Sequence, residues 1–302
     1  GLWIFGWDRL PKKIHLATIW MASLGTLLSA YFILAANAWM QHPVAYVINA
    51  EKHRAELTNI ITVLTQKTAV VTFLHTIPSA LFTAGAFVAG ISAWLILKKK
   101  DVEMARPTLK MGLITILISF IGIGISGDVI GKVMTEQQPM KMAAAEALYE
   151  TTSSAPFSLL TIGTLDGSRS VFQIDVPSVL SFLATGDFKS TVQGVNDLQA
   201  QYENTYGPGN YTPNIPLAYW SFRLMIGFGA LAFFLALFTL WRTRKGGALP
   251  QGRWFLPAMI SLPFMPLLAN SFGWIFTETA RQPWAVFGLI KTADGVSAVV
   301  SA

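Results

Sequence analysis

The sequence contains no cysteine and few charged residues. Of its 302 residues, 13% are Asp, Glu, Lys or Arg, against about 25% in soluble domains. The absence of cysteine excludes disulfide bonds, thiolate metal sites, cysteine nucleophiles and c-type haem attachment. The scarcity of charge, together with 53% hydrophobic residues and a mean hydropathy of +0.49, indicates an integral membrane protein.

Apolar runs of about 20 residues are long enough to cross a bilayer as helices. Five such crossings are predicted, at residues 14–40, 69–97, 108–127, 216–241 and 254–279. The predicted fold is therefore an all-α integral membrane protein, a polytopic helical bundle with five complete transmembrane helices. We divide the chain into membrane helices at 1–134, a long loop at 135–214, and membrane helices with a C-terminal segment at 215–302.

The basic residues cluster in the short connections between these runs. The three clusters are Arg9, Lys12 and Lys13; Lys98, Lys99, Lys100, Arg106 and Lys110; and Arg242, Arg244, Lys245 and Arg253. Since Lys and Arg in short loops favour the cytoplasmic side, all three clusters are predicted to be cytoplasmic and the long loop external. The net charge of +6 is then an orientation signal and does not indicate nucleic-acid binding.

The long loop is acidic and far exceeds the usual length of a connection, so it is expected to be functional or partly disordered. Its first part, residues 137–150, is rich in Ala, Met, Glu and Leu and favours a helix. Its last part, residues 204–214, is rich in turn-forming residues.

His75 is an ionisable residue within an apolar run, which by default suggests a functional site. It lies about six residues inside the second predicted crossing, and Met225 lies about nine residues inside the fourth. At 1.5 Å per residue both are roughly 9 to 14 Å deep from the same side. Imidazole and thioether are a known axial pair of low-spin haem iron, and Arg223 is placed to meet haem propionates. The alternatives are a hydrogen bond from His75 to a carbonyl and a packing role for Met225.

Other polar residues have both functional and structural interpretations. Glu278 and Arg281 are three residues apart beside Trp274, a spacing typical of a salt bridge at a helix end. Ser29 and Asn37 are eight residues apart and share a helix face, as part of a proton path or as interhelical contacts.

Six separated strings carry a resemblance to a known family. They are FGWDRLPKKIH, LSAYFILAANAWMQHPVAY, VTFLHT, PMKMAAAEAL, AYWSFRLMIG and GWIFTETARQPW. In this order and with this long loop, the chain resembles subunit I of the cytochrome bd-type quinol oxidases over almost its whole length. The family has further helices at both ends, so the chain is expected to be a fragment lacking them.

The resemblance implies roles for individual residues. His75 and Met225 match the axial ligands of haem b558, with Arg223 at its edge. Lys141 and Glu146 match residues of the quinol-binding loop, the Q-loop, where they are expected to take up quinol protons. The remaining matches are Glu278 as ligand of a high-spin haem iron, Trp274 and Arg281 as its neighbours, and Ser29 and Asn37 on the proton path.

The resemblance also implies the activity, the cofactors and the partners. Quinol is expected to be oxidised at the external side of a bacterial or archaeal cytoplasmic membrane. Electrons are expected to pass through haem b558 to haems b595 and d, which reduce oxygen to water without proton pumping. The expected partners are subunit II, a small single-helix accessory subunit and membrane lipid.

The sequence departs from the family at one position, and two alternative functions stay open. Ala280 stands where the family usually has glycine before RQPW, which is tolerable only if the backbone there is not at positive φ. A helical secondary transporter remains an alternative, with His75, Arg223 and Glu278 as proton or substrate sites. A purely structural membrane subunit is a third possibility.

Overall fold

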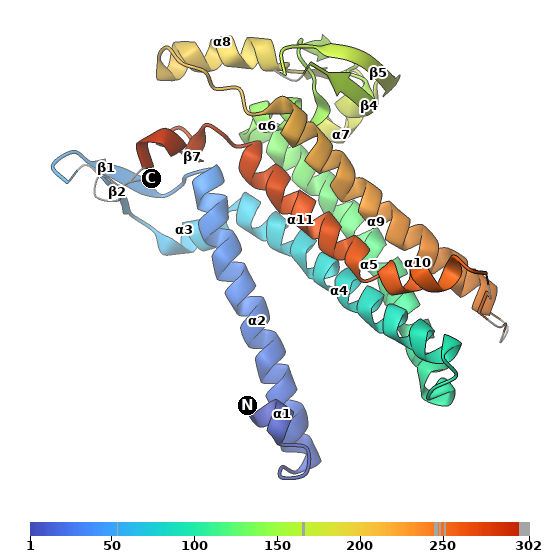
Figure 1. The fold of residues 1–302 in the computed structure, drawn as a ribbon. Coiled ribbons are helices and arrows are strands. Elements are labelled where there is room, and N and C mark those ends of the chain that lie inside the picture. The colour runs from blue at the N-terminus through green and yellow to red at the C-terminus, as the bar shows by residue number, and fades with distance from the viewer. Residues whose placement is uncertain (53, 165–166, 245–246, 248, 251, 296–302) are drawn as a thin grey trace. The chain divides into compact units, whose positions relative to one another are not determined.

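The structure is a computed structural model of residues 1–302. It describes the chain apart from residues 53, 165–166, 245–246, 248, 251 and 296–302. Residues 1–73 and 74–302 form two compact units, and each is described by itself. Long helices dominate both units (Figure 1).

Four of the five predicted crossings are confirmed as continuous apolar helices, and the fifth is a pair of helices bent at a break. Four are continuous: α2 (Lys12–Gln41), α4 (Lys67–Leu97), α5 (Val102–Gln137) and α9 (Ile215–Thr243). The fifth consists of α10 (Phe255–Ser261) and α11 (Phe264–Thr279), which meet at an angle of 43°. Pro263 lies at the break, where it lacks the N–H of a helical hydrogen bond and its ring crowds the carbonyl four residues earlier, which favours a bend.

Helix α5 is longer than the crossing predicted at 108–127. It continues to Gln137 because polar residues beyond the apolar run sustain it. Lys132 donates to Asp128 at 2.6 Å, an i,i+4 ion pair on the helix surface. Hydropathy therefore located the crossing but not the end of the helix.

The first unit contains α1 (Leu2–Phe5), α2, and the segment that follows it. That segment forms a hairpin of β1 (Tyr46–Asn49) and β2 (Arg54–Leu57), then α3 (Ile60–Thr65). Asn59 caps α3 by accepting from the backbone N–H groups of Ile61 and Thr62. Tyr31 on α2 donates to the carbonyl of Leu64 at 2.5 Å, which fixes this segment against the long helix.

In the second unit, small residues lie where the backbones of α4 and α5 come close to each other. A Cβ on Gly112 of α5 would lie 2.8 Å from the backbone of α4 at Ala89 and Gly85. Phe82, Leu113 and Met259 fill the space around this contact and are buried. Glycine at this crossing thus allows α4 and α5 to pack backbone to backbone.

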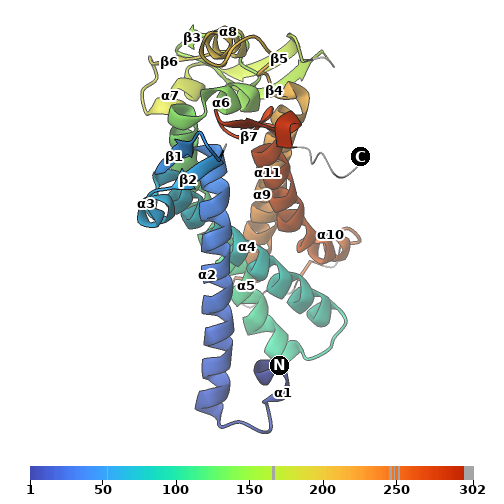
Figure 2. The ribbon, with the colours of Figure 1, turned by 90° about the vertical axis from the view of Figure 1, so that its left-hand side faces the viewer.

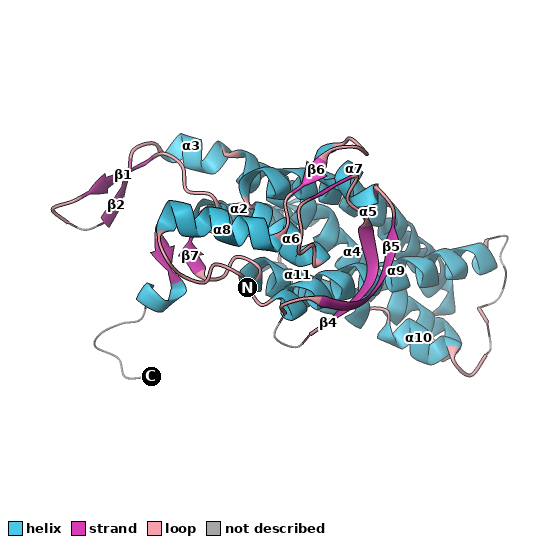
Figure 3. Ribbon diagram, turned by 90° about the horizontal axis from the view of Figure 1, so that it is seen from above, coloured by secondary structure: helices cyan, strands magenta, loops and turns pink. Residues whose placement is uncertain are grey.

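The long loop is folded, with both helices and strands. It contains α6 (Pro139–Glu146), β3 (Thr152–Ser153), β4 (Phe157–Gly163), β5 (Ser170–Val176), α7 (Val179–Thr185), β6 (Thr191–Val192) and α8 (Val195–Tyr206). The helix predicted within 137–150 is confirmed as α6, and the turn-rich end follows α8. The strands were not predicted. Figure 3 shows β4 and β5 side by side as a curved hairpin.

Within the second unit, the loop elements gather at one end of α5, α9 and α11 (Figures 1 and 2). The α4–α5 turn and the end of α9, which carry described residues of two of the three basic clusters, lie at the other end. The side of the membrane on which each end lies stays a prediction.

The segment after α11 adds a short hairpin of β7 (Trp284–Val286) and β8 (Ile290–Lys291), then a 3-10 turn (Thr292–Gly295). The Trp284 ring stacks on Tyr211 at a centroid distance of 5.6 Å and meets Tyr206 edge-on at 4.9 Å. Lys291 donates to the Tyr211 hydroxyl at 3.3 Å. The β7–β8 hairpin is thereby fixed to the end of the long loop.

Candidate functional site

His75 lies on α4 and faces α5. Its Nδ1 is 2.9 Å from the hydroxyl oxygen of Ser126, and a Cβ on Gly127 would lie 3.6 Å from its Cε1. Ser79, one turn later, donates to the His75 carbonyl at 2.9 Å. The ring is half-buried, its Nδ1 lies against the Ser126 hydroxyl, and the backbone of Ile123 on α5 is a further hydrogen-bond partner of the ring.

Met225 lies on α9 and faces α11. A Cβ on Gly273 would lie 3.0 Å from its sulfur, closer than packing normally allows. Glycine is therefore required at 273 if the thioether keeps this position. His75 and Met225 each rest against a glycine, but on different neighbouring helices.

Arg223, two residues before Met225, forms the most buried ion pair of the described residues. Its guanidinium donates to both carboxylate oxygens of Glu146, at 2.6 Å and 3.3 Å, and to the carbonyl of Ser158 at 2.6 Å. The Arg223 and Glu146 side chains are 11% and 3% exposed. Phe157 and Tyr219 flank the guanidinium, each ring centroid 4.7 Å away. The ion pair thus joins Arg223, predicted at the haem edge, to Glu146, predicted in the quinol-binding loop.

The electrostatics of Glu146 result from two opposing effects. Burial raises the pKa of its carboxyl above the ordinary value, and the nearby Arg223 charge opposes this rise. A carboxylate in this environment accepts a proton more readily than one in water.

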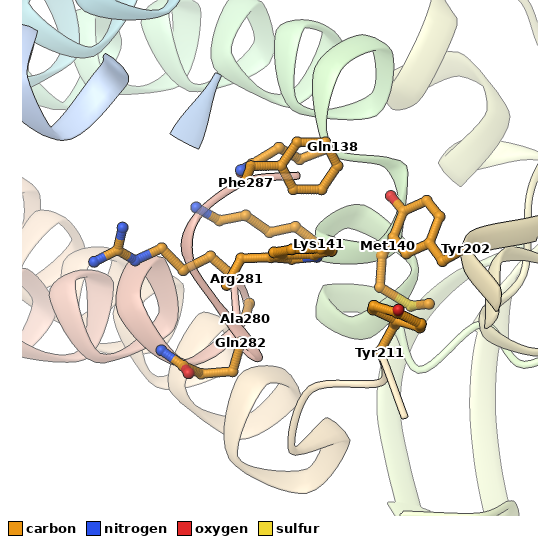
Figure 4. Close-up of a pocket in the computed structure, with 10 residues that line it drawn as sticks. Gln138, Met140, Lys141, Tyr202, Tyr211, Ala280, Arg281, Gln282 and Phe287 are labelled. Atoms are coloured by element: carbon orange, nitrogen blue, oxygen red, sulfur yellow. The ribbon is translucent and has the colours of Figure 1, made fainter. Parts of the chain in front are cut away.

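Lys141 lies on the same short helix but turns toward α11. Its ammonium donates to the carbonyl of Thr277 at 3.3 Å and lies 5.5 Å from the centre of the Phe276 ring. Lys141 extends beside Arg281 at a cavity of about 10 Å³, enough for about one water (Figure 4). Burial lowers the pKa of Lys141 from 10.5 to about 7, and Glu278 opposes this change.

The low pKa of Lys141 predicts a pH-dependent stability. The pKa of Lys141 is about 7 in the folded chain and about 10.4 in an ordinary lysine. At a pH between these two values, Lys141 is protonated in the unfolded chain and neutral in the folded chain. The free energy of unfolding should therefore rise with pH over this window, by up to about 1.4 kcal/mol per pH unit from this residue.

Thermal unfolding of the purified complex at several pH values between about 7 and 9 checks this expectation. Wild type should gain stability relative to Lys141→Met as the pH increases. Parallel curves for the two proteins would contradict a buried, readily deprotonated Lys141.

Glu278 and Arg281 form the helix-end salt bridge that their spacing allows. Arg281 donates to Glu278 at 2.6 Å and to the carbonyl of Ala285 at 2.8 Å. The Glu278 side chain is 38% exposed, and Trp274 is also exposed. Ala280 has φ −76° and ψ −7°, so alanine causes no backbone strain where the family usually has glycine.

Ser29 and Asn37 lie on α2, in the first unit. Ser29 is exposed, and Asn37 is half-buried and accepts from the side chain of Gln41 at 2.6 Å. Both interpretations of this pair, proton path and helix contact, stay predictions.

Two residues that sequence reasoning missed belong to this region. Ser126 contacts the His75 ring, and the buried Tyr219 donates to or accepts from Ser158 at 2.9 Å beside Arg223. Tyr219 lies in AYWSFRLMIG, one helical turn before Arg223. This spacing places both side chains on one helix face and could have indicated the contact. Ser126 had no such signal, because serine is common near helix ends.

Long apolar helices, with a histidine within one and a buried Arg–Glu pair at the end of another, define a multi-pass helical membrane protein. Among the described residues no group of three or more His, Asp and Glu side chains is placed to hold a metal ion. The family model described as Cytochrome bd terminal oxidase subunit I matches residues 1–302. The chain therefore belongs to this family.

Individual relatives support the assignment. The cytochrome bd ubiquinol oxidase subunit 1 of Bacillus subtilis (strain 168) is 44% identical over 304 residues, covering 100% of this chain and 64% of the relative. The cytochrome bd-II ubiquinol oxidase subunit 1 of Escherichia coli (strain K12) is 29% identical over 100% of this chain and 70% of the relative. The chain thus spans about two thirds of the length of these curated relatives.

A solved structure also matches. It is described as the bd oxidase from Geobacillus thermodenitrificans, with a TM-score of 0.85 and 26% identity, covering 98% of this chain and 66% of the other. The fold prediction is confirmed by this likeness and by the apolar helices.

Proposed function

We propose that the chain acts as subunit I of a cytochrome bd-type terminal oxidase, a quinol:oxygen oxidoreductase. In this role it oxidises quinol at the external side and delivers electrons, through haem b558 and the high-spin haems b595 and d, to oxygen. The observation that carries the proposal is the Arg223–Glu146 pair. It joins the predicted quinol loop to the helix turn that also carries Met225.

The residues fit a low-spin haem. The Ser126 contact at Nδ1 leaves Nε2 of His75 for iron, and Met225 presents its sulfur where Gly273 has no side chain. Arg223 keeps its Nε without a hydrogen-bond partner among the described residues, so one donor is left for a propionate. Haem b558, when bound, supplies one-electron transfer between quinol and the high-spin haems.

The protein residues handle the protons that quinol releases. Glu146 is the proposed proton acceptor, because its buried carboxylate has a raised pKa beside a fixed guanidinium. Lys141, with a pKa of about 7, is partly neutral near neutral pH and is the proposed second acceptor. They face different helices: Glu146 contacts α9 and Lys141 contacts α11.

The remaining assignments follow the family. Glu278 is proposed as the ligand of a high-spin haem iron, with Arg281 and Trp274 beside it. Ser29 and Asn37 are proposed to line the proton entry. Subunit II, a small single-helix accessory subunit and membrane lipid are the proposed partners, with the basic loops cytoplasmic and the Q-loop external.

Quinol-dependent oxygen consumption by the purified complex tests the function. Glu146→Leu and Lys141→Leu should lower turnover by about 100-fold or more, the size of a lost acid–base group, while haem content stays unchanged. Glu150→Leu and Lys189→Leu, which alter exposed charges of the same loop, should leave turnover near wild type.

Two outcomes would count against the proposal. If all four variants have the same turnover, Glu146 and Lys141 matter no more than the exposed charges of the loop, and the loop does not oxidise quinol. If the wild-type complex shows no b-type band in a reduced-minus-oxidised spectrum, the haem assignment is wrong and the transporter alternative gains support.

A further inference from the structure

Ser126 is a half-buried serine on α5 with no role in the sequence prediction. Its hydroxyl oxygen lies 2.9 Å from Nδ1 of His75 on the facing helix. The same hydroxyl donates to the Gly122 carbonyl at 2.7 Å and lies 3.3 Å from that of Ile123. Ser126 therefore connects the His75 ring to the backbone of α5.

These contacts decide which ring nitrogen carries the proton. A serine hydroxyl has one proton to donate, and the carbonyls of α5 take it. Toward His75 the oxygen can then act only as an acceptor, so Nδ1 must be the protonated nitrogen. The lone pair of the neutral imidazole lies on Nε2, the nitrogen on the other side of the ring.

We propose that Ser126 is a positioning residue for His75, which holds the imidazole in the Nδ1–H tautomer so that Nε2 is presented to the iron of haem b558. The inference rests on the proposed function. It goes beyond it by assigning to α5 a residue that orients a ligand on α4. Histidine ligands generally donate their second N–H to a polar partner that fixes ring orientation.

The His75 ring packs against small residues of α5. Gly127 follows Ser126, and a Cβ there would meet Cε1 at an ordinary contact distance of 3.6 Å. Pro78 on α4 packs against Gly122, one turn before Ser126, so the two helices meet closely on this face. Because small residues line the contact, the polar groups that α5 presents to the ring are the Ser126 hydroxyl and the Ile123 backbone carbonyl, and the hydroxyl is the one that a substitution can remove.

The hydrogen bond has an electronic consequence. An imidazole that donates from Nδ1 is a more basic ligand, and a more basic ligand favours the oxidised iron. Loss of the acceptor should therefore make reduction of the low-spin haem easier. A shift in the midpoint potential therefore distinguishes a residue that orients the ligand from one that only packs two helices together.

Redox titration of the low-spin b band in the complete oxidase complex tests the proposal. Ser126→Ala should keep the band and shift its midpoint to a more positive potential, and Ser126→Thr, which restores the hydroxyl, should return it toward wild type. Ser119→Ala is the matched control, since it removes a buried hydroxyl from α5 two turns earlier and should not move the midpoint.

The outcomes are distinguishable. An unchanged midpoint in Ser126→Ala, or an equal shift in Ser119→Ala, overturns the inference and leaves the proposed function intact. Loss of the band in both the Ala and the Thr variant of an assembled complex also overturns the inference, because it shows that Ser126 acts through helix packing. Absence of the band from wild type rejects the proposed function itself.

Discussion

Replacement of His75 by alanine is expected to remove the low-spin haem band from the reduced-minus-oxidised spectrum and to reduce quinol-dependent oxygen consumption to background. Alanine offers no nitrogen to the iron, and the cavity it leaves between α4 and α5 lies in an apolar environment that does not supply another ligand. The measurement is the spectrum of the purified complex, normalised to protein, together with its oxygen consumption.

His15→Ala is the control for this experiment. His15 is a histidine that bonds to the carbonyl of Trp3 at 2.8 Å and has no predicted cofactor role, so its loss should leave the band in place. Retention of a wild-type band in His75→Ala would disprove ligation by His75. Loss of the whole complex from the membrane would indicate a folding defect, and Met225→Leu, which keeps apolar volume at the predicted sixth ligand, then decides between the two.

Separate removal of Arg223 and of Glu146 is expected to harm stability more than their joint removal. Each single change leaves one charge buried without its partner, a situation that costs about 3–5 kcal/mol in proteins. Replacement of both by apolar residues of similar size leaves no such charge. The thermal midpoint of Arg223→Met with Glu146→Leu should therefore lie closer to wild type than either single variant.

A double-mutant cycle on the purified complex measures this coupling. The exposed pair Lys52 and Glu56, 3.3 Å apart, is the control, and its cycle should give close to zero. Additive effects at Arg223 and Glu146 would show that the buried pair does not form. Turnover provides a second readout: the double variant should remain inactive even where stability recovers, because the proposed proton acceptor is absent.

Sequence reasoning located the membrane helices because their signal is local. A run of apolar residues predicts a crossing wherever it occurs, and four of the five runs form continuous helices, while the fifth forms a bent pair. The break at Pro263 was also visible in SLPF, yet it was assigned to a continuous run. The end of α5 was missed because ion pairs such as Asp128 with Lys132 extend a helix past its apolar part.

The long-range contacts of the site were less predictable. Glu146 and Arg223 are 77 residues apart, and nothing in either local segment indicates that they meet. The strands of the long loop did have a signal, since FSLLTIG and SVFQIDV are rich in β-branched and aromatic residues on either side of a Gly-containing turn. The family resemblance identified which residues matter, but the contacts between them came from the fold.

The short helix α6 carries two buried charges that are held by different membrane helices. Lys141 is fixed at the end of α11, and Glu146 is fixed on α9. Moving α6 away from one helix strains the contact with the other, and releasing only one leaves a charge in an apolar setting. The loop is therefore expected to open as a single cooperative unit, so that admission of the proposed quinol and exposure of the two proposed proton acceptors to water become one event.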